Sequence, residues 1–349
     1  MAAALSLAVL GLSGCAQSGA KTSAEASAEN PMVLTLAHGL SETHTVHIAM
    51  TEFADKVEER TNGRIQVRIL PNGQLGSENE NMEQLMAGVI SMTKVSAPGL
   101  ATYNESYHAF GLPYIFDDTE DFYHVMDSDP MQDFFLSSSD DGFVTLTYYT
   151  SGARSFYTKN KAIRTPADLK GLKIRVQDMK SQTDMMKALG GIPVAMSYGD
   201  VYTSLQTGLI SGQFAAPHWA VKANYQDICK YATDIGLDST MGELLTVNLT
   251  KWNSLPTEVQ DIILEVSKEL EQYHLEYTNE CRSKAYDTFV EAGGTIVTMS
   301  DEEKAAWLNA LPNIPDTATE LGPTGLKILE RYVEKENGVN IPRDWQFNY

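Results

Sequence analysis

The longest regular pattern in the sequence is a helical one, which runs from Pro256 to Ala292. Its apolar residues recur at helical spacing, at Val259, Ile262, Ile263, Val266, Leu270, Tyr273 and Tyr277. Proline suits the first turn of a helix, and the Gly293-Gly294 pair suits its end. A helix of about 37 residues is roughly 55 Å long, whereas a small domain is only about 30 Å across. The pattern therefore predicts a helix that lies across two domains.

Strand-like and helix-like segments alternate along the rest of the chain. In the first part, apolar runs at 33–37 and 65–69 alternate with helical patterns at 50–57 and 82–89. In the second part, strand-like runs at 143–149 and 172–176 precede helical patterns at 183–189 and 198–210. This succession predicts two α/β domains with parallel strands, whose ligand binds beyond the carboxyl ends of the strands. The second domain is expected to begin near Ser151, and 349 residues, 43% of them apolar, suffice for a core in each domain.

The overall charge narrows the classes of partner. The formal net charge is -20, which leaves no basic surface for nucleic acid or for anionic lipid, and we expect neither to bind the folded body. No segment after Cys15 has the roughly 20 uninterrupted apolar residues that a membrane helix needs.

The amino-terminal residues 1–14 are small and apolar and are too few to span a bilayer. They are typical of a signal peptide, and Leu12-Ser13-Gly14-Cys15 resembles the bacterial lipobox, in which the cysteine becomes a lipidated terminus. A signal peptide begins with Lys or Arg, which no residue before Cys15 supplies, so we expect the natural start to lie upstream. Residues 15–31 lack apolar periodicity and are expected to form a lipid-anchored flexible tether that reaches roughly 20 Å.

The histidines and cysteines give weak signals. His38, His44 and His47 lie close together, but a zinc site needs three or four convergent ligands, so a cleft-facing or capping role is favoured over a metal site. Among them His38, at the first strand-to-helix turn, is the best candidate to touch a ligand. For Cys229 and Cys281 two separate buried thiols are favoured, although the sequence leaves a disulfide open.

We find no pattern typical of an enzyme. The chain has no serine on a glycine-flanked elbow, no cysteine with a histidine partner and no phosphate-binding glycine loop, so we expect no catalytic residue, cofactor or metal. Asp117-Asp118 and Asp140-Asp141 are acidic pairs, but adjacent residues do not face one another on a helix or a strand. Both pairs are interpreted as solvated turns.

Two arginines are more informative. Alternation in the run from Leu172 to Val176 places Ile174 on the core face and Arg175 on the opposite face. Arg154 follows the point where the strand before Ser151 leaves its sheet. Two guanidinium groups near the ends of strands could together hold one carboxylate, each through paired hydrogen bonds. The alternative for either arginine alone is a salt bridge to one of the 46 acidic residues, and spacing does not decide between them.

The body of the chain, from about Val33 to Asn337, resembles the substrate-binding proteins of tripartite ATP-independent periplasmic (TRAP) transporters, of the C4-dicarboxylate-binding type. The resemblance rests on the segments "FADKVEERTNGRIQVRILPNGQLGSENENMEQLMAGVISM", "FGLPYIFDD", "TPADLKGLKIRVQDM", "GDVYTSLQTGLISGQ" and "WNSLPTEVQDII". It implies a two-domain periplasmic-binding-protein-like α/β fold, with a ligand cleft at the hinge and a long helix across both domains. The chain divides accordingly into domain I, at 32–150 and about 239–278, and domain II, at 151–238 and about 279–349.

The resemblance also assigns a ligand site. The carboxylate-binding arginine of the family falls on Arg175, and a second, less universal one falls on Arg154. The remaining cleft positions are His38, Ser96 and Tyr198, together with Ala215, His218 and Trp219. Where relatives often carry Asn, this chain has Ala215, which cannot donate a hydrogen bond and which leaves room for a bulkier or aromatic acid.

The function implied is that of an extracytoplasmic receptor, tethered to the membrane through Cys15. It would bind an organic acid, such as a sugar acid or a bulkier acid, and deliver it to a TRAP permease for uptake driven by an ion gradient. Two alternatives stay open at this stage: a ligand-sensing module for a membrane signalling protein, and a secreted α/β enzyme that acts on an acid.

Overall fold

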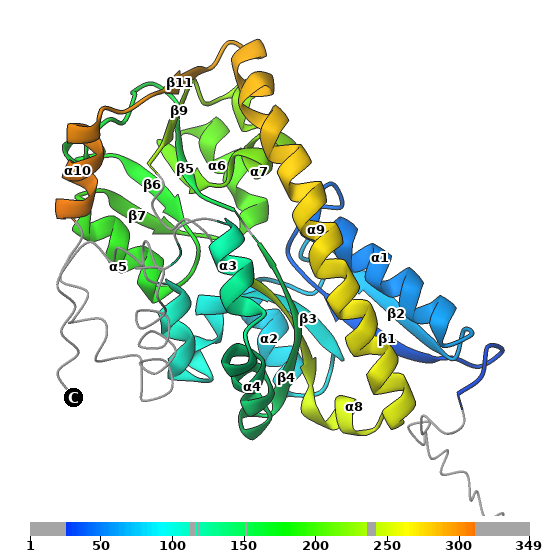
Figure 1. Cartoon of the computed structure of the whole chain (residues 1–349). Helices are drawn as coiled ribbons and strands as arrows, with labels where there is room; N and C mark the ends of the chain where they lie inside the picture. Colours follow the sequence, from blue (N-terminus) through cyan, green and yellow to red (C-terminus); the bar gives the residue numbers. More distant parts are fainter. Residues whose placement is uncertain (1–25, 112–115, 117–118, 151, 236–241, 311–349) are drawn as a thin grey trace, which may run out of the picture.

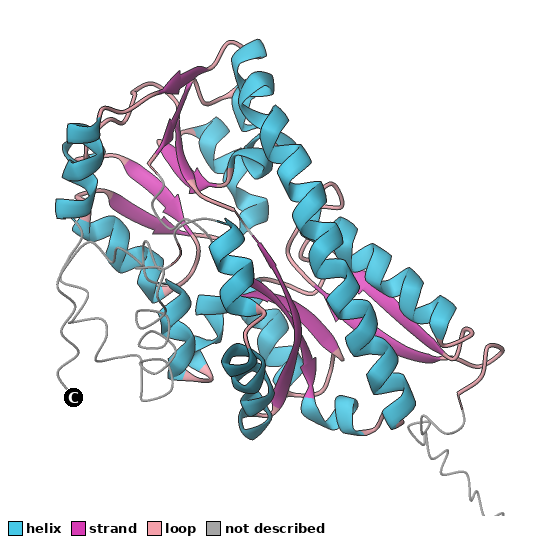
Figure 2. Ribbon diagram, viewed as in Figure 1, coloured by secondary structure: helices cyan, strands magenta, loops and turns pink. Residues whose placement is uncertain are grey.

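A computed structural model describes residues 26–111, 116, 119–150, 152–235 and 242–310 of the chain. The strands form two separate sheets, and helices pack on both of them (Figure 1, Figure 2). The predicted signal peptide and Cys15 lie outside the described residues. Within them, the end of the predicted tether forms a turn in which Ser27 and Asn30 exchange backbone hydrogen bonds of 3.2 and 3.0 Å. No helix in the described ranges has the length and apolarity that a bilayer crossing requires.

The first sheet has the strand order β2-β1-β3-β10-β4. Its strands are β1 (Met32–Ala37), β2 (Ile65–Leu70), β3 (Met92–Ser96), β4 (Phe143–Thr150) and β10 (Gly242–Asn248). β1 runs parallel to β2 and β3, whereas β10 is antiparallel to β3 and β4. The prediction of a parallel sheet is therefore wrong for β10. The reason is topological: β4 leads toward the second sheet and β10 leads back from it, so these neighbours run in opposite directions.

The second sheet has the strand order β11-β9-β5-β8-β6-β7. Its strands are β5 (Ser155–Thr158), β6 (Lys173–Val176), β7 (Ile192–Ala195), β8 (Gly212–Ala215), β9 (Tyr231–Asp234) and β11 (Thr295–Val297). β6 is parallel to β7 and β8, and β5 is antiparallel to β8 and β9. This sheet is also mixed, contrary to the expectation. Only β6 was predicted: it has four residues, as do β5, β7, β8 and β9, but its apolar residues alternate with Lys173 and Arg175.

Helices cover both sheets. They are α1 (Thr45–Arg60), α2 (Glu78–Met86), α3 (Thr119–Met126), α4 (Asp129–Ser137), α5 (Lys180–Ala188), α6 (Val201–Thr207), α7 (Pro217–Lys222), α8 (Leu249–Asn253), α9 (Thr257–Glu291) and α10 (Asp301–Ala310). Two predicted helices are shorter than expected. α2 ends at Met86, and Val89 is 69% exposed. α6 ends at Thr207 because Gly208 adopts the left-handed conformation with φ of 79°.

The long helix α9 confirms the prediction from periodicity. It spans 35 residues between an N-cap at Pro256 and a C-cap at Ala292, and Gly293 follows with φ of 85°. We call the part of the protein built on the first sheet the first half and the part built on the second sheet the second half. α9 packs against α1 and β4 of the first half and against α7 and β11 of the second half (Figure 1). Its residues Val259, Ile263, Val266 and Leu270 join the core that α1 and the first sheet build.

Cys229 and Cys281 are free thiols, which confirms the part of the prediction that says they do not pair. Cys229 is fully buried, and burial raises the pKa of its thiol to about 12. Cys281 is only partly buried on α9, so the expectation that both are buried holds for Cys229 alone.

Candidate ligand-binding site

A cavity of about 350 Å³ lies between the two sheets. From the first half it is lined by residues 39–40, 72–73, 76–80, Lys94 and Glu243. From the second half it is lined by Arg154, Arg175, residues 177–179 and 196–200, Ala215 and Trp219. Most of these positions follow the carboxyl ends of parallel strands, at β1 and β2 on one side and at β6, β7 and β8 on the other. The cavity therefore lies where an open α/β sheet places a ligand.

Local sequence brings the start of α2 to the cavity. The Pro71-Asn72-Gly73 turn ends β2, and Asn72 and Gly73 both take positive φ. Ser77 then caps α2, because its hydroxyl accepts from the backbone N–H of Glu80 while the Glu80 carboxylate accepts from the backbone N–H of Ser77. This capping box fixes Glu78, the first residue of the helix, against the cavity.

Arg175 lies on the second-half wall of the cavity. Its neighbours Ile174 and Val176 are buried in the core of the second half, as alternation predicted, but Arg175 is itself only 5% exposed. Its Nε and Nη2 donate to the carbonyl oxygen of Met196 at 3.2 and 3.0 Å. No carboxylate among the described residues lies within ion-pair distance of its guanidinium. Burial lowers the pKa of Arg175 to about 10, and the side chain is therefore still charged at neutral pH.

Arg154 lies on the same wall, just before β5, and is 1% exposed. Gly152 precedes it with φ of 68°, a left-handed conformation that turns the chain between the two sheets. The Arg154 guanidinium carbon is 5.9 Å from the centre of the Trp219 ring, within the range of a cation–π contact. The positive charge of Arg154 also contributes, after burial, to the lowered pKa of Arg175, so the two guanidinium groups influence one another across the wall.

Aromatic rings close the side of the cavity next to the arginines. Tyr198 and Trp219 both line it, with their ring centres 6.5 Å apart in an edge-to-face arrangement. Behind them, His44 packs 4.1 Å from Trp219 and caps α1 by accepting from the backbone N–H of Val46. Complete burial, ahead of the influence of His218 and Lys94 nearby, holds the pKa of His44 well below its usual 6.5. The wall thus combines two cationic groups with neutral aromatic surface.

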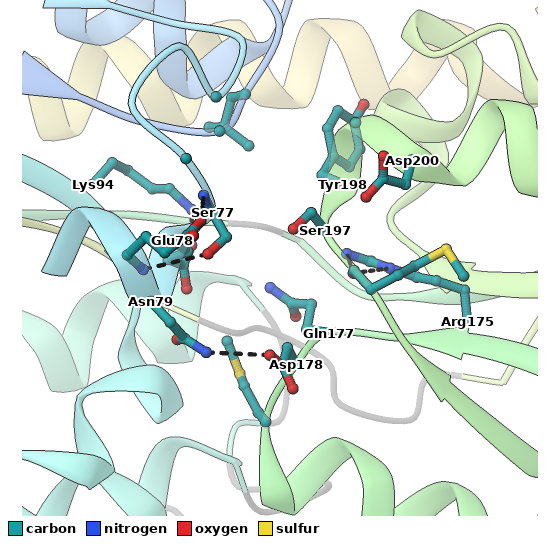
Figure 3. A pocket seen from close by; sticks show the side chains of 18 of the residues that line it. Ser77, Glu78, Asn79, Lys94, Arg175, Gln177, Asp178, Ser197, Tyr198 and Asp200 are labelled. Atoms are coloured by element: carbon teal, nitrogen blue, oxygen red, sulfur yellow. Dashed lines mark hydrogen bonds and ion pairs between the residues drawn. The ribbon is translucent and has the colours of Figure 1, made fainter. Parts of the chain in front are cut away.

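The first-half wall carries a buried ion-pair cluster (Figure 3). Lys94 Nζ lies 2.7 Å from Glu78 Oε2 and 2.7 Å from Glu243 Oε2. Lys94 is 3% exposed and Glu243 1%. Burial disfavours the charged lysine, but the two carboxylates more than offset this penalty and raise the pKa of Lys94 to about 12. In Figure 3, Lys94 and Glu78 lie on one side of the open space, with Arg175 and Tyr198 on the other.

Two side-chain hydrogen bonds join the walls. Gln177 Nε2 donates to Ser96 Oγ at 2.9 Å, and Asn79 Nδ2 donates to Asp178 Oδ2 at 3.3 Å. Each bond connects a residue of the first half with one that follows β6, so together they hold the two sides of the cavity against each other.

The structure brings five of the eight predicted ligand-site residues to the cavity: Arg154, Arg175, Tyr198, Ala215 and Trp219. The other three, His38, Ser96 and His218, are buried and are not among the residues that line it. His38 Nδ1 accepts from the backbone N–H of Leu40, and its Nε2 lies 3.1 Å from His47 Nδ1. Burial, with His47 and Lys94 nearby, lowers the pKa of His38 to about 3.

Three further points concern a metal site, the acidic pairs and the cavity residues that were not predicted. Within the described residues no group of three or more His, Cys, Asp or Glu side chains is suited to hold a metal ion. Asp140 and Asp141 end a short 3₁₀ turn, Ser138–Asp141, whereas Asp117 and Asp118 lie outside the described residues. Lys94, Glu78 and Glu243 were not predicted from the sequence, although the alternation of apolar and polar residues at 90–93, immediately before Lys94, was a usable signal of a strand.

The protein has two sheets covered by helices, a long helix that packs on both halves, and a cavity with a buried arginine that no described carboxylate neutralises. These features define a two-lobed binding protein for small anionic solutes. Residues 36–320 match the family described as bacterial extracellular solute-binding protein, family 7, and the chain belongs to that family. It is accordingly an extracytoplasmic solute receptor of the TRAP type.

Similar proteins carry different names. The uncharacterised protein YiiZ of Salmonella typhimurium is 34% identical over 232 residues, which cover 66% of this chain and 70% of that protein. The C4-dicarboxylate-binding periplasmic protein DctP of Rhodobacter capsulatus is 29% identical, with 83% and 87% covered. A TRAP periplasmic solute-binding protein of Anaerococcus prevotii, solved with bound D-glucuronate, is 28% identical, with 87% and 99% covered and a TM-score of 0.79.

Proposed function

We propose that this receptor captures an organic acid by its carboxylate at Arg175 and Arg154 and delivers it to the membrane subunits of a TRAP permease. The observation that carries the proposal is the burial of Arg175 at the cavity without a carboxylate partner among the described residues. A buried charge of this kind costs free energy unless a counter-ion neutralises it. A ligand carboxylate supplies that counter-ion.

Closure around the ligand would use both walls. A ligand that contacts the arginines and the Lys94 wall at once gains interactions that separated halves do not offer, which shifts the population toward the closed form. The division into domain I, at 32–150 and about 239–278, and domain II, at 151–238 and about 279–349, is part of this proposal. Delivery without chemistry is also part of it, since the residues at the cavity include no activated nucleophile that we identify.

The class of ligand follows from relatives and from Ala215. D-glucuronate is bound in one similar structure, and a C4-dicarboxylate is named for another relative. In this chain, Ala215 and Trp219 leave an apolar surface beside the arginines. We therefore propose that the ligand is a sugar acid or a bulkier or aromatic acid.

Membrane attachment through Cys15, after removal of residues 1–14, completes the proposal. Fractionation of bacterial cells that produce the chain tests it: the protein should sediment with membranes, and Cys15→Ala should release it into the soluble extracytoplasmic fraction. Equal distribution of both forms would contradict the anchor and leave the receptor function intact.

The ligand site is tested by a thermal-shift screen of the body from Pro31 onward against sugar acids, keto acids, dicarboxylates and aromatic acids. A ligand at about 100 times its Kd adds about 2.7 kcal/mol to the free energy of unfolding. Arg175→Ala should weaken binding of the best acid by about 3 kcal/mol or more, over 100-fold, since two charge-assisted hydrogen bonds are lost. Arg68→Ala, at an exposed position of β2, is the matched control. Undiminished binding by Arg175→Ala would overturn the site.

A sensor that passes a ligand signal to a membrane protein would use the same cavity. Co-purification from membranes separates the two functions: a permease subunit should accompany the liganded receptor, whereas a signalling protein in its place would favour the sensor.

A further inference from the structure

On the Lys94 wall, one hydrogen-bond donor and one acceptor have no partner among the described residues. Lys94 directs two of its three ammonium protons to Glu78 and Glu243, and the third has no partner among the described residues. Glu243 uses Oε2 for Lys94 and for the Ser96 hydroxyl at 3.0 Å, whereas its Oε1 is buried and has no hydrogen-bond partner in the same part of the chain. One donor and one acceptor therefore remain without a partner among the described residues, on two side chains that are joined by an ion pair and that both line the cavity.

The Lys94 wall is more negative than the arginine wall. Lys94 contributes one positive charge and Glu78 and Glu243 two negative charges, so the cluster has a net charge of about -1, and Glu80 lines the cavity on the same side. On the other side, the two positive charges of Arg154 and Arg175 are accompanied by Asp178 and Asp200, which also line the cavity. A ligand that spans the cavity thus meets two buried guanidinium groups at one end and a negatively charged cluster at the other.

Four kinds of distal group can be compared against this wall. A second carboxylate would face Glu243 and Glu78 and would be repelled. An apolar end would leave the buried Glu243 Oε1 without a partner, which is costly for a carboxylate oxygen. An ammonium would face Lys94. A hydroxyl group both donates and accepts, so it satisfies Glu243 Oε1 and the third Lys94 proton together.

We propose that Glu243 and Lys94 form a hydroxyl-binding subsite that makes this receptor select hydroxylated monocarboxylates over dicarboxylates. The inference rests on the proposed function, because it requires that the ligand carboxylate be held at Arg175. Within that function it assigns specificity to Glu243 and Lys94, neither of which was among the site residues expected from the sequence.

Binding calorimetry with matched acids tests the proposal. D-gluconate, D-glucarate and hexanoate share a six-carbon chain and end in a hydroxyl, a carboxylate and a methyl group, respectively, and D-glucuronate adds the ring form. The native chain should bind D-gluconate or D-glucuronate at least tenfold more tightly than D-glucarate and hexanoate. Glu243→Gln, which keeps the size and removes the charge, should reduce the preference over D-glucarate at least tenfold.

Controls separate specificity from folding. Glu83→Gln removes the same charge from the exposed face of α2 and should leave the preference unchanged. Should Glu243→Gln fail to fold, as judged by its melting temperature, Glu78→Gln provides the same test at a side chain that is 22% exposed.

The outcomes distinguish the two proposals. If D-glucarate binds as tightly as the hydroxylated monocarboxylates, if only acids without hydroxyls bind, or if the folded variants keep the native preference, the subsite is wrong although the receptor function stands. If no acid binds, or if Arg175→Ala binds every probe as the native chain does, the carboxylate receptor itself fails and the subsite falls with it.

Discussion

The two walls of the cavity bury cations in opposite ways. On the second-half wall, the guanidinium of Arg175 donates to a backbone carbonyl and forms no ion pair with a carboxylate of the described residues. On the first-half wall, the ammonium of Lys94 is held between Glu78 and Glu243 at 2.7 Å each. Burial without a counter-ion keeps a charge available to a ligand, whereas burial with two counter-ions fixes a charge as part of the structure. Burial alone therefore does not identify a binding residue, and its partners must be counted.

The largest effect is expected when Lys94, the buried cation with two carboxylate partners, is replaced. Lys94→Met removes the cation and leaves Glu78 and Glu243 facing each other in a buried site. We expect a loss of about 3–5 kcal/mol in the free energy of unfolding, measured by urea denaturation. Lys94→Met combined with Glu243→Leu should recover part of that loss. A single variant within 1 kcal/mol of the native chain would show that the cluster is not a structural requirement.

Arg175→Lys tests the buried cation that forms no ion pair within the described residues. A lysine keeps the charge but cannot reproduce the planar, paired donors of a guanidinium. The affinity for the best acid should fall by about 2 kcal/mol, roughly 30-fold, with little change in melting temperature. Native affinity in this variant would mean that charge alone, and not geometry, holds the carboxylate.

Arg154→Ala should have a smaller effect than Arg175→Ala. Arg154 lies on the same wall, but its guanidinium also contacts the Trp219 ring, so only part of its interaction is directed to the ligand. We expect a loss of affinity of about 1–2 kcal/mol, by calorimetry. If Arg154→Ala weakens binding more than Arg175→Ala does, the order of the two residues must be reversed.

Buried histidines differ from Arg175, because burial leaves a histidine neutral whereas Arg175 keeps its charge. Burial lowers the pKa of His274 from 6.5 to about 3, so below pH 6.5 the unfolded chain binds the proton that the folded chain refuses. Stability should therefore be lost as the pH falls. From pH 6.5 to 5.5, His274→Gln should lose about 1 kcal/mol less than the native chain in urea titrations. His124→Gln, at an exposed position, is the control, and equal slopes in all three proteins would contradict the assignment.

The smallest effect concerns the contact between the walls. Gln177→Ala removes the 2.9 Å hydrogen bond to Ser96 that joins them. Since a single neutral hydrogen bond contributes about 0.5–1.5 kcal/mol, ligand affinity should fall by no more than about tenfold. An increase in affinity would indicate that the bond opposes closure.

The sequence predicts those elements whose patterns are long or uninterrupted. α9 was found because its apolar spacing persists over many turns, and β6 because its residues alternate around Arg175. β10 was missed, since all seven of its residues are buried and polar Glu243 and Asn248 stand among apolar ones. A strand that is covered on both faces has no alternation to detect.

The candidate site was predicted unevenly for the same kind of reason. Arg175 and Arg154 stand out because each interrupts or follows a strand-like run, and the family resemblance then gave them a partner. The Lys94–Glu243 pair could not be predicted, because its members are 149 positions apart and meet only through the antiparallel pairing of β3 with β10. His38, Ser96 and His218 were placed near the site by chain position, which does not tell which side chains reach the cavity.

The helix α9 also sets how any movement of the receptor can be observed. An α-helix cannot lengthen without breaking its own hydrogen bonds, so the 35 residues of α9 act as a strut of fixed length, about 52 Å, that belongs to both halves. Opening of the cavity must then be a rotation or bending relative to this strut. Fluorescent labels at the two ends of α9 would report a constant separation, whereas a pair placed on α2 and α5 would report the motion.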